Sequence, residues 1–214
     1  VLWYQGESNA DRPEEYEQLL PVLVNDWRSK WGQPELPFLY AQLPNFMEVD
    51  YSPSESQWAQ LRESQLKALR INKTAMVVTI DLGEWNDIHP GNKRPIGDRF
   101  ALAAQHVAYN DKSVVYSGPI LTSSSVINNK VTLSFNHIGD GLISKDGEYL
   151  RWFAIADEDK CFVWANAIIK DDKVEVWSDE ILHPVYVRYA WADNPEEVNF
   201  YNKEGLPASP FQTQ

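Results

Sequence analysis

A histidine two positions after an aspartate is the first feature of the sequence that could do chemistry. His89 follows Asp87 in the stretch Asp87-Ile88-His89-Pro90, where Pro90 stiffens the backbone. An imidazole serves as a general base near neutral pH, and a neighbouring carboxylate holds its tautomer and stabilises the imidazolium. Asp-x-His sequences also cap ordinary loops, so the spacing alone leaves a catalytic and a loop-capping interpretation open.

A second group of polar residues lies close to Val1. The run Gln5-Gly6-Glu7-Ser8-Asn9 follows an apolar stretch and supplies a carboxylate, a hydroxyl and two amides. These are the groups that acid–base, nucleophilic and oxyanion-stabilising roles require. A serine in a turn after a strand invites the interpretation that Ser8 is a nucleophile.

Alternating strand-like and helix-like segments over residues 1–110 would position both groups. The strand candidates are Val1–Gln5, Pro37–Leu43 and Ala75–Ile80; the helices are expected after a cap at Asp11 and Glu14, after a cap at Ser54 and Gln57, and from Ile96 to Val107. This order predicts a doubly wound parallel α/β sheet. Ligands bind beyond the carboxyl ends of such strands. We therefore expect residues 5–9, 42–45 and 81–90 at one edge.

The second half of the chain has a different pattern. From about Lys112, short aromatic and β-branched runs alternate with turn signals such as Asn128-Asn129 and Asp146-Gly147. This pattern predicts an all-β antiparallel sandwich or jelly-roll module. We expect two domains, an α/β part over residues 1–111 and a β-sandwich with a C-terminal tail over residues 112–214.

Composition excludes several classes of function. The formal net charge is −12 and no basic stripe is visible, which argues against nucleic-acid binding. No apolar run reaches the roughly 18 residues of a membrane span. The single cysteine, Cys161, excludes an internal disulfide and is expected to be buried. No CxxC or HExxH pattern indicates a metal site, and no metal or organic cofactor is implied.

An ordered set of motifs resembles one enzyme family. WYQGESNA, DWRxxW, PFxxxQLPN, WxxLRExQ, DLGxxxDIHPxNK and GDR occur in this order, followed by a tail from VRYAWADNP to SPFQT. Together they resemble the sialate O-acetylesterase branch of the SGNH/GDSL-type hydrolases, over nearly the whole chain. The resemblance implies a three-layer, flavodoxin-like α/β sheet and a carboxylic ester hydrolase that removes acetyl groups from sugars by Ser-His-acid chemistry.

The resemblance also implies roles for individual residues. His89 is the expected catalytic base and Asp87 its acid partner, although the family's usual acid spacing of three would fall on Asn86. Glu7 is the competing acid. Gln5 and Asn9 match the family segment that contributes to the oxyanion hole.

One residue of the second helix is also a candidate. Arg62 could bind a substrate carboxylate or fix Glu7, and a plain ion pair on the helix is an equal alternative.

The same comparison argues against Ser8 as the nucleophile. Only 81 residues separate Ser8 from His89, whereas such a sheet holds about five parallel strands between the nucleophile and the histidine. We expect Ser8 to be a supporting hydroxyl. The nucleophilic serine should lie upstream of Val1, in an N-terminal segment of the same protein that completes the sheet, and this chain alone should be inactive.

Substrate and location are constrained less tightly. Sialic acid is an anion, so a sialate esterase of this charge needs a local cation such as Arg62 or Arg94. An acetyl-xylan or other neutral-glycan acetylesterase is the alternative enzyme, and a carbohydrate-binding or structural module without activity is the non-enzyme alternative. The resemblance implies an extracellular, periplasmic or lysosomal protein.

Overall fold

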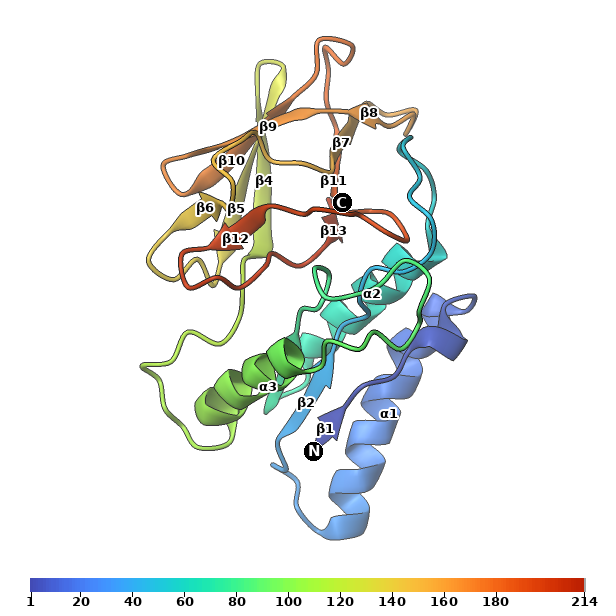
Figure 1. Cartoon of the computed structure of the whole chain (residues 1–214), viewed down its shortest axis with the longest axis vertical. Coiled ribbons are helices and arrows are strands. Elements are labelled where there is room, and N and C mark those ends of the chain that lie inside the picture. The colour runs from blue at the N-terminus through green and yellow to red at the C-terminus, as the bar shows by residue number, and fades with distance from the viewer. Residues whose placement is uncertain (214) are drawn as a thin grey trace.

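Three apolar segments of the first half form a parallel sheet. The computed structural model describes residues 1–213, and its strand order is β1-β2-β3, with every neighbouring pair parallel. Strand β1 spans Leu2–Trp3, β2 spans Phe38–Ala41 and β3 spans Thr74–Val77. The strands are shorter than the predicted segments, but their order along the chain is as expected (Figure 1).

Helices cover both faces of this sheet. They are α1 (Pro13–Trp31), α2 (Gln57–Lys67) and α3 (Arg94–Val107), with short 3-10 turns η1 (Glu7–Asn9) and η2 (Ala68–Arg70). Successive side chains of a strand point to opposite faces. Leu39 and Ala41 of β2 accordingly pack in one core cluster with α3, while Phe38 and Tyr40 pack in the cluster that includes residues of α1 and α2.

The observed N-terminal ends of helices α1 and α2 differ from the two predicted caps. The side chain of Ser56, not Ser54, caps α2, because its Oγ accepts the backbone N–H of Ala59 at 2.9 Å. Helix α1 follows Arg12 and has no side-chain cap bond. It runs through Pro21 as one helix. Over residues 1–213, no helix is both long and apolar enough to cross a membrane.

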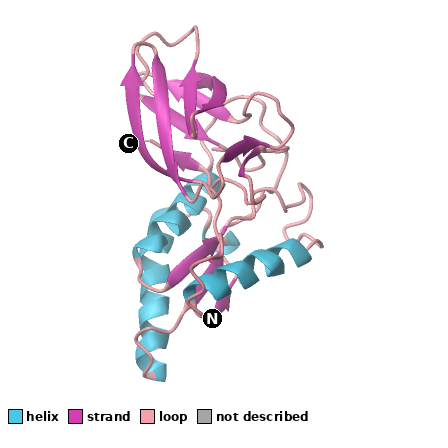
Figure 2. Cartoon of the chain, turned by 90° about the vertical axis from the view of Figure 1, so that its left-hand side faces the viewer, coloured by secondary structure: helices cyan, strands magenta, loops and turns pink. Residues whose placement is uncertain are grey.

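The second half contains strands and no helix among its described residues. They are β4 (Ile120–Ile127), β5 (Lys130–Asn136), β6 (Leu142–Ser144), β7 (Phe153–Ala156), β8 (Val163–Trp164), β9 (Asn166–Lys170), β10 (Lys173–Trp177), β11 (Tyr186–Tyr189), β12 (Phe200–Asn202) and β13 (Phe211–Gln212). All pairings are antiparallel. The sheet orders are β4-β5-β10-β9, β13-β11-β7-β8 and β12-β6 (Figure 2).

The fold class is therefore a mixed one, with a partial parallel sheet followed by antiparallel sheets. The expected flavodoxin-like SGNH layering, the jelly-roll topology and the domain division between residues 111 and 112 stay predictions.

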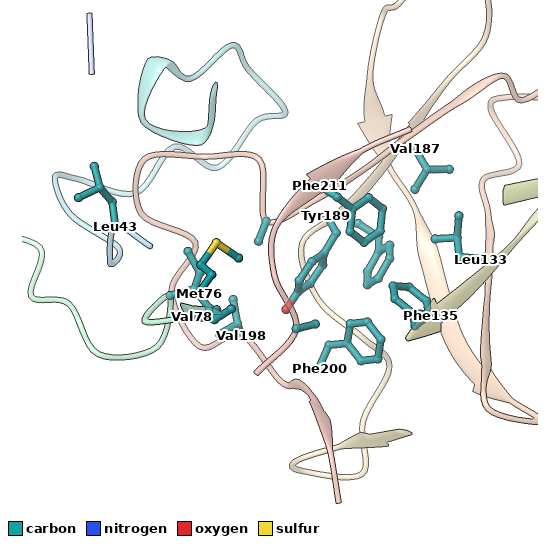
Figure 3. Packing of buried hydrophobic residues seen from close by; sticks show 14 of the residues in the cluster. Leu43, Met76, Val78, Leu133, Phe135, Val187, Tyr189, Val198, Phe200 and Phe211 are labelled. Atoms are coloured by element: carbon teal, nitrogen blue, oxygen red, sulfur yellow. The ribbon is translucent and has the colours of Figure 1, made fainter. Parts of the chain in front are cut away.

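One buried cluster runs through both halves, since Val198 lies beside Met76 and Val78 (Figure 3). Cys161 is exposed, contrary to expectation, because it lies just after the turn at residues 158–159, where its N–H donates to Oδ1 of Asp159.

A buried arginine joins the two halves. The Arg62 side chain, fully buried on α2, donates hydrogen bonds of 2.7–2.9 Å to four backbone carbonyls, those of Leu43, Pro44, Ala192 and Asp193. A guanidinium can satisfy several carbonyls at once because its donors form a planar fork. Desolvation lowers the pKa of Arg62, and the Asp193 carboxylate partly offsets this.

Asparagine side chains tie the loops after the strands to each other. Oδ1 of Asn45, after β2, accepts the N–H of Gly83 at 2.8 Å, and its Nδ2 donates to Asn194 at 2.8 Å. The approach at Gly83 is so close that an added Cβ would lie 1.8 Å from the carbonyl oxygen of Asn45. The loop that carries His89 therefore starts from a fixed point.

We predict that Arg62→Lys lowers the free energy of unfolding by about 2–4 kcal/mol, because lysine keeps the charge but cannot reach all four buried carbonyls. Urea unfolding measures the effect. Arg12→Lys is the matched control, since Arg12 is 52% exposed in its surface ion pairs. A loss below about 1 kcal/mol in Arg62→Lys would contradict the role assigned to this side chain.

We predict that Gly83→Ala destabilises the protein by about 1–3 kcal/mol, the usual cost of forcing extra atoms into a packed site. Thermal unfolding measures it. Gly97→Ala is the control: nothing lies within 4 Å of its added Cβ, and alanine is the better helix former by up to about 1 kcal/mol. Equal melting temperatures for the two variants would refute the close approach at Gly83.

Candidate active site

The ends of the parallel strands bring the predicted chemical groups to one edge of the sheet. Residues from the turn after β1 and from the loop after β3 line one cavity of about 330 Å³, and they are Tyr4, Glu7, Ser8, Ile88, His89 and Lys93. This confirms the expected meeting of these two segments. An imidazole, a carboxylate, a hydroxyl and an ammonium group therefore share one opening.

The loop after β3 presents His89 to solvent. Oδ1 of Asp87 accepts the backbone N–H of His89 at 2.8 Å, and Oε1 of Glu84 accepts that of Gly91 at 2.8 Å. The hydrogen bond that Asp87 accepts thus shapes the turn that carries the histidine. In the described part of the chain, no hydrogen bond joins the Asp87 carboxylate to the imidazole. The loop-capping contact is present, and the role of Asp87 as acid stays a prediction.

Glu7 shares the cavity with His89. Its Oε2 accepts the N–H of Gly6 at 2.8 Å, which fixes the carboxylate at the start of η1. The negative charge of Glu7 also contributes, after desolvation by burial, to raising the pKa of Tyr4 to about 12. Glu7 and His89 thus line the same cavity, with no hydrogen bond between their side chains among residues 1–213, and the role of Glu7 as the competing acid stays a prediction.

The two amides expected at the oxyanion hole bind each other. Nε2 of Gln5 donates to Oδ1 of Asn9 at 3.0 Å, and the backbone carbonyl of Gln5 accepts a hydrogen bond from the hydroxyl of Tyr16 at 2.9 Å. Both side chains line a different cavity, of about 410 Å³, between β1 and α1. The structure does not bring them into the cavity of His89.

Arg62 requires a correction. The sequence suggested a contact with a substrate carboxylate or with Glu7, but its guanidinium is buried and bonded to four backbone carbonyls. It therefore positions the loop after β2 and does not reach the cavity of His89. The contact with Ala192 and Asp193 could not be read from the helix pattern, because those residues lie far along the chain.

Ser8 is exposed and lines the cavity of His89. No hydrogen bond between the two side chains is present among residues 1–213. The structure thus brings this hydroxyl near the histidine without a nucleophile–base contact, and the predicted supporting role stays a prediction.

Two residues of the cavity were not identified as site residues from the sequence. Tyr4 forms one wall, and Nζ of Lys93 lies 5.1 Å from the centroid of its ring. One sequence signal could have identified Tyr4. Successive side chains of a strand point to opposite faces, so Tyr4 is expected on the face opposite to that of Trp3. Lys93 directly precedes α3. Within the described residues, no group of three or more His, Cys, Asp or Glu side chains could hold a metal ion.

Comparisons with known proteins agree with the resemblance. Residues 1–106 match the family model described as carbohydrate esterase, sialic acid-specific acetylesterase. Sialate O-acetylesterase of Mus musculus is 29% identical over 239 residues, covering 100% of this chain and 44% of that protein. The Homo sapiens sialate O-acetylesterase is 25% identical over 235 residues, covering 99% of this chain and 45% of that protein.

A solved structure is also similar to this chain over its whole length. The crystal structure of a carbohydrate acetylesterase from Xanthomonas citri superposes with a TM-score of 0.94 at 43% identity, covering 100% of this chain and 50% of that chain. The chain thus spans about half the length of the relatives it matches. From the family match and these relatives together, residues 1–106 belong to the carbohydrate esterase family of the sialic acid-specific acetylesterases, and the similarity to these relatives extends over the whole chain.

Proposed function

We propose that the protein is a carbohydrate O-acetylesterase that cleaves acetyl esters on sugars by Ser-His-acid chemistry. One observation carries the proposal: His89 and Glu7 share a cavity at the carboxyl edge of a parallel sheet, in a chain of the acetylesterase family. In this proposal His89 takes the proton of a serine hydroxyl as it attacks the acetyl carbonyl. The same imidazolium then returns the proton to the leaving sugar oxygen.

The nucleophile is proposed to come from a further segment of the protein, N-terminal to this chain. Among residues 1–213, strand β1 has a neighbouring strand on one side only, and Leu2 is 64% exposed. Beside this edge lies the largely apolar cavity between β1 and α1 that holds the amides of Gln5 and Asn9. A strand added here would cover the apolar surface and bring the residue at its carboxyl end close to the two amides. Gln5 and Asn9 would then donate to the oxyanion.

The cations near His89 bear on whether the acetylated sugar is anionic or neutral. The sialate prediction required a cation such as Arg62 or Arg94. Arg62 is buried, and Arg94 is fully on the surface, 3.9 Å from Asp98. The cavity itself offers Lys93. An O-acetylated sialic acid would therefore have to pair with Lys93, whereas a neutral sugar needs no such pair. Location outside the cytoplasm stays a prediction from the family resemblance.

We predict that His89→Ala in the complete enzyme lowers kcat/KM on an acetylated sugar by about a thousandfold or more, because the general base is lost. Ser8→Ala should keep most of the activity. Initial rates of acetate release measure both, and circular dichroism checks that each variant is folded. An active His89→Ala, or a Ser8→Ala variant as impaired as His89→Ala, would disprove the assignment.

The acid is tested by two amide substitutions made in parallel. We expect Asp87→Asn to reduce kcat by at least about a hundredfold if its carboxylate orients the imidazole, and Glu7→Gln to reduce it less. The reverse order would make Glu7 the acid. Asp98→Asn, on the exposed side of α3, is the matched control. Negligible loss in both Asp87→Asn and Glu7→Gln would refute a carboxylate partner on this chain.

A further inference from the structure

A larger cavity lies away from His89, where the two halves of the chain meet. It measures about 550 Å³ and is bounded by the segment between β2 and α2, by β7 and β8, and by Glu196 and Glu197. Tyr51, Trp152 and Trp164 give it aromatic walls. Tyr51 is 82% exposed and Trp164 40% exposed. Figure 1 shows the segment after β2 rising beside β8. We call the surface formed by Tyr51, Trp152 and Trp164 the aromatic groove.

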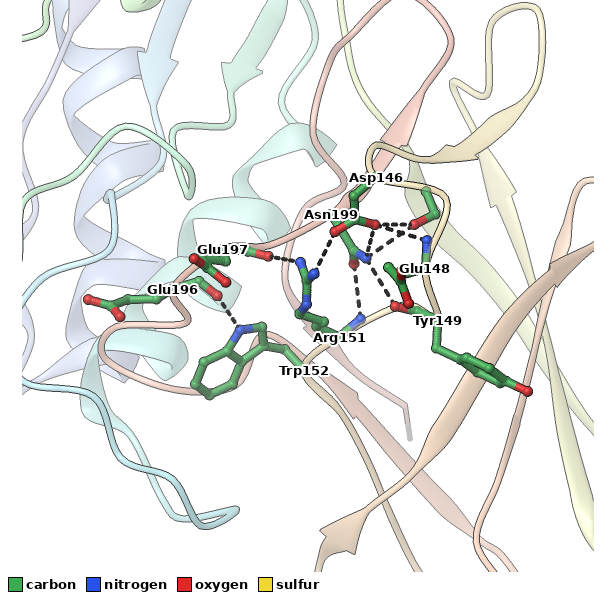
Figure 4. A network of polar contacts seen from close by, with 9 residues as sticks. Asp146, Glu148, Tyr149, Arg151, Trp152, Glu196, Glu197 and Asn199 are labelled. Atoms are coloured by element: carbon green, nitrogen blue, oxygen red, sulfur yellow. Dashed lines mark hydrogen bonds and ion pairs between the residues drawn. The ribbon is translucent and has the colours of Figure 1, made fainter.

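The walls of the groove are held in place. Nε1 of Trp164 donates to the backbone oxygen of Tyr51 at 2.8 Å, and Nε1 of Trp152 donates to that of Glu196 (Figure 4). The two indole rings meet edge to face, with centroids 5.4 Å apart. The indole N–H groups are thus satisfied by the protein itself, and the rings are left as rigid apolar surfaces. A groove of this kind loses little conformational freedom when it binds a ligand.

The polar rim of the groove carries no free cation among the described residues that line it. Arg151 donates to the carboxylate of Asp146 and to the backbone oxygen of Glu197 (Figure 4). Asn199 holds the same loop, because its Oδ1 accepts the N–H of Arg151 at 3.0 Å. The side chains of Glu196 and Glu197 add negative charge at the rim. An anionic ligand is therefore disfavoured here.

The groove continues toward the catalytic loop. An adjoining cavity of about 310 Å³ shares Val49, Tyr51 and Glu196 with it and is lined on its other side by Trp85. Trp85 is 53% exposed and belongs to the loop that also carries His89. A chain-like ligand lying in the groove would thus run from the β half to the loop of the proposed base.

We propose that the aromatic groove binds further sugar units of an uncharged oligosaccharide whose acetylated unit reaches His89. This inference rests on the proposed function and gives it a substrate class. The C–H faces of pyranose rings are apolar and stack on aromatic side chains, while their hydroxyl groups donate to carboxylates and backbone carbonyls. Aromatic walls with a carboxylate rim match that chemistry, and they select against the carboxylate of a sialylated chain.

The test is a calorimetric titration of the complete protein with xylotetraose, cellotetraose and mannotetraose, and with 3′-sialyllactose. Tyr51→Ala is the principal variant, because the backbone oxygen that holds Trp164 remains. Trp164→Ala is the second variant. Tyr109→Ala is the matched control, since Tyr109 is 81% exposed at the end of α3, away from the groove. Hydrolysis of 4-nitrophenyl acetate by the wild type tests the proposed function separately.

We expect saturable binding of at least one neutral oligosaccharide, weaker binding of sialyllactose, and unchanged binding by Tyr109→Ala. Tyr51→Ala and Trp164→Ala should each raise Kd by about threefold to tenfold, the loss of one stacking partner. Equal affinity of Tyr51→Ala and Tyr109→Ala would overturn the proposal, as would tighter binding of sialyllactose or no binding by the wild type. An inactive wild type that still binds sugar through Tyr51 would refute the proposed function alone.

Discussion

The buried guanidinium of Arg62 is the interaction on which the arrangement depends. A desolvated cation is costly unless its donors are satisfied, and here four backbone carbonyls from two distant parts of the chain meet that demand. Leu43 and Pro44 follow β2, whereas Ala192 and Asp193 belong to the tail of the β half. The loop after β2 therefore cannot move without the tail, and both halves are fixed to one sheet edge.

The contacts of Arg62 also fix the position of the loop that carries His89. Asn45 comes directly after the carbonyls that bind Arg62, and it holds Gly83, where the loop of His89 begins. Asn194, next to Asp193, binds the same asparagine. The histidine is thus exposed on a loop whose base is anchored, which is a usual way to place a reactive group on a rigid scaffold. The same tail places Glu196 and Glu197 at the aromatic groove.

Sequence patterns predicted the local structure of the first half well and the long-range contacts poorly. Period and turn signals located the strands, the helices and the edge where Glu7 and His89 meet. The role of Arg62 was not predictable, since two of its four partners, Ala192 and Asp193, lie about 130 residues away. Alternating aromatic residues such as Trp152 and Trp164 indicate a core strand, and only the folded chain shows them at a groove. The apolar run that begins at Cys161 misled for a related reason: Cys161 directly follows an exposed turn, to which its N–H is bonded through Asp159.

We propose that this chain supplies the base of an acetylesterase site and that the nucleophile lies in another segment of the protein. Labelling the complete protein with a serine-directed fluorophosphonate, followed by peptide mapping, tests it most directly. We expect one labelled serine outside residues 1–214 and loss of that label in His89→Ala. A label on Ser8, or labelling that is independent of His89, would contradict it.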